Sequence, residues 1–79
     1  MADKRQLERV LDQINNLRDT CEGDDDFLEV ESFRPGDVRF YKITSHRGSN
    51  SISLNDTIDK TCAYADGMLY ALRFFANKK

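Results

Sequence analysis

The sequence predicts an α+β fold in the chain order α-β-β-β-α, with a three-stranded antiparallel meander and two helices packed on one face of it. Two observations predict this fold. Apolar residues recur at helical spacing near both ends of the chain, and three short runs between them are rich in β-branched and aromatic residues. The 79 residues are expected to form a single domain, 1–79, with a small core.

The first helix is predicted over residues 4–21. Asp3 followed three residues later by Gln6 is typical of a capping box, and Gly23 can supply the left-handed conformation that often follows a helix. The apolar residues of this segment recur at intervals of three and four: Leu7, Val10, Leu11, Ile14, Leu17 and Cys21.

Two strands, 27–33 and 38–45, are predicted to form a hairpin. The Pro-Gly pair at 35–36 is typical of the two central positions of a type II turn, with a positive φ at the glycine. Such a turn places Phe33 opposite Val38 and fixes the pairing of the two strands.

This pairing divides the side chains between two faces of the sheet. The face expected to join the core carries Leu28, Val30, Tyr41 and Ile43. The outer face mixes aromatic and charged residues: Phe27, Glu29, Glu31, Phe33, Val38, Phe40, Lys42 and Thr44. A third strand over 50–54, after a loop containing Gly48, is expected to place Ile52 and Leu54 on the core face.

The second helix is predicted over residues 56–77, because Asn55 and Asp56 are good N-cap residues. One stripe is expected to cover the sheet: Ile58, Cys62, Ala65, Leu69, Leu72 and Ala76, with Met68 and Phe75 beside it.

A second face of this helix is also apolar. Ala63, Gly67 and Ala71 repeat every four residues and form a groove of small side chains flanked by aromatic residues, Tyr64, Tyr70 and Phe74. Glycine in a helix interior costs about 0.5–1 kcal/mol relative to alanine, and close approach by another element would explain it. That element is either the first helix of the same chain or the second helix of another copy.

No residue pattern predicts catalysis, a metal site or a cofactor. The single histidine, His46, is expected in a solvated turn, and the acidic run at 22–26 lacks the ligand spacing of an EF-hand loop. The glycines occur singly, so no phosphate-binding loop is predicted. Cys21 and Cys62 have no CxxC spacing and are expected to be buried, free thiols.

The net charge of −2 is unevenly distributed. Residues 22–33 contain six acids and no base, whereas 34–54 contain four bases, Arg34, Arg39, Lys42 and Arg47. The acidic block argues against a general nucleic-acid binder, although these four bases keep that function as the alternative. No apolar run predicts a signal peptide or a membrane span, so we expect a cytoplasmic protein without a membrane partner.

The sequence therefore favours a non-enzymatic module that binds another protein. The expected contacts lie on the outer sheet face and in the acidic loop, which would steer association: Phe33, Val38, Phe40, Glu29, Glu31, Asp24, Asp25 and Asp26. A homodimer is expected to form through the second face of the last helix: Ala63, Tyr64, Gly67, Tyr70, Ala71 and Phe74.

Two resemblances accompany these expectations. The element order and the alanine-rich last helix resemble double-stranded-RNA-binding domains, which open that helix with lysines where this chain has Asn-Asp-Thr-Ile-Asp-Lys, with only Lys60. By size, acidic loop and layout, without a shared motif, the chain is similar to small phage-encoded accessory proteins, including some anti-CRISPR inhibitors. That resemblance implies a stoichiometric protein that occupies a surface of a larger complex and has no active site.

Overall fold

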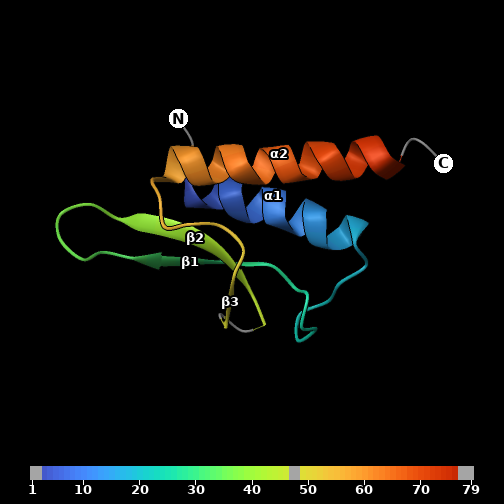
Figure 1. Cartoon of the computed structure of the whole chain (residues 1–79), viewed down its shortest axis with the longest axis horizontal. Helices are drawn as coiled ribbons and strands as arrows, with labels where there is room; N and C mark the ends of the chain where they lie inside the picture. Colours follow the sequence, from blue (N-terminus) through green and yellow to red (C-terminus); the bar gives the residue numbers. More distant parts are fainter. Residues whose placement is uncertain (1–2, 47–48, 77–79) are drawn as a thin grey trace.

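Two helices lie side by side over one face of a three-stranded antiparallel sheet in the computed structural model (Figure 1), which describes residues 3–46 and 49–76. The elements are α1 (Lys4–Leu17), β1 (Glu29–Phe33), β2 (Phe40–Ser45), β3 (Asn50–Ser51) and α2 (Ile58–Ala76), and the strand order is β1-β2-β3. The predicted α+β class and element order are confirmed. Among these described residues, nine buried apolar side chains form the core: Leu7, Val10, Leu11, Ile14, Leu28, Ile43, Cys62, Ala65 and Leu69.

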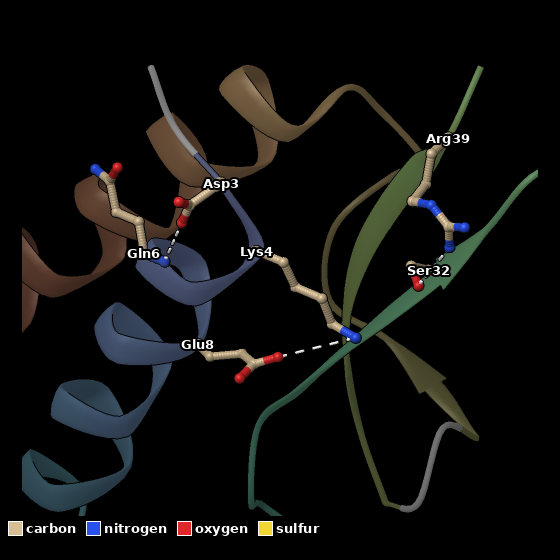
Figure 2. Close-up of polar contacts among 6 residues, drawn as sticks. All are labelled: Asp3, Lys4, Gln6, Glu8, Ser32 and Arg39. Carbon is tan, nitrogen blue, oxygen red and sulfur yellow. Dashed lines mark hydrogen bonds and ion pairs between the residues drawn. The ribbon is translucent and has the colours of Figure 1, made fainter.

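The start of α1 is as predicted. Asp3 is the N-cap residue, and its Oδ1 accepts a hydrogen bond from the backbone N–H of Gln6 at 2.8 Å (Figure 2). The carbonyl of Asp3 accepts from the N–H of Leu7 and so begins the helical ladder. One turn along, Lys4 Nζ lies 3.9 Å from Glu8 Oε1, an exposed pair that adds little to stability.

The predicted end of α1 at residue 21 is wrong, because the helix stops at Leu17. Asp19 takes the left-handed conformation with φ 56°, its N–H donates to the carbonyl of Asn16, and the N–H of Thr20 donates to the carbonyl of Asn15. These two bonds make a Schellman motif, with an aspartate where glycine is usual. Leu17 is consequently exposed instead of joining the apolar stripe.

Asp19→Gly is expected to stabilise the fold by about 0.5–1 kcal/mol, because a left-handed conformation is strained for a residue with a Cβ and free for glycine. Urea unfolding followed by circular dichroism measures this change. Asp19→Val should lower the stability instead, since a β-branched side chain tolerates this conformation least. A glycine variant less stable than the parent would contradict the Schellman assignment.

The hairpin of β1 and β2 has a different register from the predicted one. Phe33 lies opposite Phe40, not Val38, so the connecting loop spans 34–39. The φ of Gly36 lies outside the left-handed region, so the predicted type II turn does not form. The pairing is shifted by two residues, which leaves every side chain on its predicted face because side chains alternate with period two.

The third strand is interrupted. Only Asn50–Ser51 forms β3, with Thr44 opposite Ser51. Nearer the start of β2, Tyr41 lies opposite Asp56 and exchanges two backbone hydrogen bonds with it, at 2.8 and 2.9 Å. The segment between these contacts is therefore longer than the stretch of β2 that it faces, and it bulges outward.

The bulge reverses one prediction about the core. Ser53 takes the position of a strand partner, since its Oγ accepts from the N–H of Ile43 at 2.9 Å while its own N–H donates to the carbonyl of the same residue. Ile52 and Leu54, predicted to lie on the core face, are 37% and 86% exposed. Both side chains are available on the surface beside β2.

The last helix begins at Ile58, two residues later than predicted, because Asp56 pairs with β2. The Oγ1 of buried Thr61 lies 2.9 Å from the carbonyl of Thr57 and 3.3 Å from that of Tyr41, which fixes the first turn of α2 against the sheet. Phe75, expected beside the buried stripe, is exposed.

One buried polar side chain joins α1 to β1. The amide of Asn15 is 2% exposed, its Nδ2 donates to the carbonyl of Leu28 at 3.0 Å, and its Oδ1 accepts from the N–H of Leu28 at 2.9 Å. The hydroxyl of Thr20 donates to the same Oδ1 at 3.0 Å. No sequence pattern predicts this role of Asn15, whose amide takes both backbone groups of Leu28 as an adjacent strand would.

Candidate functional site

The second apolar face of α2 is open in the folded chain. All six residues predicted for an oligomer interface lie together on the exposed side of α2: Ala63, Tyr64, Gly67, Tyr70, Ala71 and Phe74. A Cβ added at Gly67 would meet no atom within 4 Å, so α1 does not fill the small-residue groove. Of the two explanations for this glycine, close approach by α1 of the same chain is wrong.

This face extends beyond α2. The hydroxyl of Tyr64 donates to the carbonyl of Ile52 at 3.1 Å, which joins the helix to the bulge where Leu54 is exposed. At the other end, the rings of Phe74 and Phe75 meet edge to face with centroids 5.9 Å apart. Between them Tyr70 is 74% exposed. Aromatic and small aliphatic side chains therefore run along the outer side of α2 from Ala63 to Phe75, and the exposed Lys60 lies in the first turn before them.

The outer sheet face carries a pair of phenylalanines. Phe33 and Phe40 are directly opposite each other, their ring centroids are 5.9 Å apart, and both are half-buried. Val38 lies in the adjoining loop and is 54% exposed. The hairpin carrying these residues projects past the N-terminal ends of both helices (Figure 1). The structure thus brings the two phenylalanines together and leaves Val38 outside the strands.

The acidic loop is more constrained than expected for a steering element. Asp24 Oδ2 accepts from the backbone N–H of Cys21 at 2.7 Å. Asp25 Oδ1 lies 2.9 Å from the ring Nδ1 of His46. The backbone N–H of His46 also donates to the backbone carbonyl of Asp25. The carbonyl of Asp26 accepts from Arg18 at 3.3 Å. The Asp24 carboxylate therefore braces the loop internally, and the Asp25 carboxylate holds it against His46, just after β2.

The two cysteines differ in environment. Cys21 is exposed, contrary to expectation, because α1 ends before it. Cys62 is buried in the core, and this burial, together with the negative charges of Asp66, Asp59 and Asp3, raises the pKa of its thiol above the ordinary value. The thiolate of Cys62 is thus disfavoured at neutral pH. Within residues 3–46 and 49–76, no group of three or more His, Cys, Asp or Glu side chains could hold a metal ion.

Three of the four basic residues of the alternative function lie in the described part of the β1–β2 hairpin. Arg34 and Arg39 are exposed in the hairpin loop, where Nη1 of Arg39 donates to Oγ of Ser32 at 3.4 Å (Figure 2). Lys42 lies in β2 opposite Glu31. Arg47 falls outside the described residues.

A groove that the sequence did not predict lies between α1 and β1. Its volume is about 380 Å³, and it is lined by three acids and four apolar residues: Glu8, Asp12, Glu29, Leu11, Phe27, Leu28 and Val30. Glu8 and Asp12 are one helical turn apart on the exposed side of α1. That spacing is the only sequence signal for the groove, since its two walls are far apart in the chain.

Comparison of the chain with known protein families, curated proteins and solved structures finds no match in any of the three. Among the described residues, no helix has the length and apolar character needed to cross a bilayer.

Proposed function

We propose that the protein is a non-enzymatic protein-binding module, a small inhibitor or assembly factor that works by occupying a partner surface, and that two copies pair through the outer side of α2. The observation that carries this proposal is the exposure of an aromatic and small-residue face along α2, centred on Gly67. Exposed apolar faces of this extent are typical of interaction sites. Such a role agrees with the resemblance to small phage accessory proteins.

The chemistry of this face favours a second copy. Glycine and alanine at four-residue spacing allow two helices to approach closely, near the lower end of the usual 8–10 Å interaxial range. A standard interface covers about 800 Å² of each partner, roughly one seventh of the 5689 Å² that this chain exposes. Pairing through α2 leaves the Phe33–Phe40 face, on the other side of the sheet, available to a partner.

Gly67→Leu separates self-association from folding. A Cβ at this position meets no atom within 4 Å in one copy, so we expect the isolated chain to gain about 0.5–1 kcal/mol of helix stability from the loss of glycine. In a paired helix the same side chain would hold the axes apart. Light scattering at high micromolar concentration should therefore give twice 9.1 kDa for the parent and 9.1 kDa for the variant.

Asp66→Leu is the matched control, because it adds the same side chain at the adjacent exposed position, about 100° around the helix axis from Gly67. This control should keep the mass of the parent. A parent mass of 9.1 kDa, or a Gly67→Leu variant that still pairs, would overturn the proposed dimer.

A further inference from the structure

Strand β1 has one open edge. It pairs only with β2 among the described residues, and its other side has no strand neighbour. On β2, the backbone groups of Tyr41 and Ile43 are bonded toward Asp56 and Ser53, on the side away from β1. Opposite residues in an antiparallel pair are either both bonded to each other or both turned outward. Val30 and Ser32, which face Ile43 and Tyr41, therefore turn their N–H and C=O groups to the open edge.

A side chain of the same chain already occupies the backbone groups just before this edge. Leu28 lies two positions before Val30 and turns the same way, and its N–H and C=O are both taken by the amide of Asn15. Asn15 thus imitates the first residue of an added strand. The next four backbone groups along the edge, those of Val30 and Ser32, remain for another chain.

The groove beside this edge determines the chemistry of that chain. Glu8, Asp12 and Glu29 line it without a basic residue, and Glu31 follows on β1. In Figure 2 the side chain of Glu8 extends from α1 toward the strands, and its Oε1 lies 3.9 Å from Nζ of Lys4 in an exposed pair. Leu11 and Val30 supply an apolar floor between the acids.

We propose that β1 binds an extended, lysine- or arginine-containing peptide segment of another protein as an added antiparallel strand. Residues of that segment opposite Glu29 and Glu31 would carry the positive charges, and the residue opposite Val30 would place an apolar side chain in the groove, since directly opposite side chains share a face. This surface is separate from the outer side of α2, so the proposal does not depend on pairing of two copies.

A fluorescein-labelled peptide of alternating lysine and valine, with blocked ends, tests this binding by fluorescence anisotropy. We expect saturable binding that weakens as salt is raised from low to physiological concentration. The matched peptide of alternating glutamate and valine should not bind. Equal binding of both peptides, or none of either, would overturn the proposal.

Ser32→Pro isolates the role of the edge. Proline removes an N–H that points outward and leaves the bonds between β1 and β2 intact, as proline on an edge strand does. Affinity for the lysine–valine peptide should fall about tenfold, the loss expected for one hydrogen bond and the added steric conflict. Circular dichroism verifies that the variant is folded, and an affinity equal to that of the parent would contradict strand addition.

Asp12→Asn tests the charge without touching the strand, and it should weaken binding about threefold. Asp66→Asn, a similar change on α2, should have no effect and serves as its control. Repeating the titration with Gly67→Leu distinguishes the two proposals, because the peptide should bind that variant as it binds the parent. If Ser32→Pro instead changes the mass by light scattering, the occupant of the edge is a second copy and the peptide proposal fails.

Discussion

Asn15→Ala is expected to destabilise the fold by about 3 kcal/mol, since it leaves two buried backbone groups of Leu28 without their partner. A domain of this size has a total unfolding free energy of roughly 4–12 kcal/mol. The variant should therefore be partly unfolded at room temperature if the parent lies at the lower end of that range. Urea unfolding followed by circular dichroism measures the loss.

Asn16→Ala provides a matched control, because Asn16 is the adjacent residue of α1 and is exposed. Its replacement should change the stability by less than about 0.5 kcal/mol. If Asn15→Ala were as mild as Asn16→Ala, the contact between α1 and the start of β1 would not be a significant part of the fold.

Ile43→Ala is expected to cost about 3–4 kcal/mol, within the range measured for buried aliphatic side chains that are truncated to alanine. Ile43 is fully buried at the centre of the middle strand, opposite Val30. Its backbone is held by Ser53 on the other side, so the surrounding chain has little freedom to close the cavity. Thermal and urea unfolding should both show the loss.

Ile52→Ala is the control for residue type, since Ile52 lies in the bulge beside Ile43 and is exposed. Its truncation should cost less than about 1 kcal/mol. Equal losses at the two positions would mean that Ile52 is in the core, as the sequence predicted, and that the bulge is absent.

The faces of the hairpin could be predicted from the sequence, and its register could not. The alternation of apolar and polar residues decides only which face a side chain takes, so a shift of two residues is invisible to it. A turn at Pro35 and Gly36 therefore predicts that Phe33 lies opposite Val38. The longer loop in the structure places Phe33 against Phe40 instead.

Helix ends and the third strand depend on contacts between distant residues. The start of α1 was predictable because Asp3 acts within four residues of itself. The end of α1 was not predictable from the sequence. It depends on the hydrogen bonds between Asn15 and Leu28, thirteen residues later, and on a left-handed conformation at Asp19 that glycine usually adopts. In the same way, the side chain of Ser53 replaces a strand residue, and no pattern of apolar residues predicts that.

The candidate sites also divide into those formed within one element, which the sequence predicts, and those formed between distant elements, which it does not. The sequence identified the small-residue face around Gly67 and left two partners open for it, and only the exposed position of that face excludes α1. The groove beside β1 was missed because Asp12 and Glu29 meet only after the chain has turned. Sequence periodicity finds surfaces within one element, and it does not find those formed between two elements.

The amide of Asn15 also limits how the sheet can grow. An exposed strand edge is a template for uncontrolled stacking of chains, and proteins commonly protect such edges by keeping them short. Here the available edge begins after Leu28, which Asn15 already occupies, and it ends with β1 at Phe33. An incoming strand consequently finds one short stretch with a fixed starting point, which allows a single added segment and discourages the continuous edge-to-edge assembly that leads to fibres.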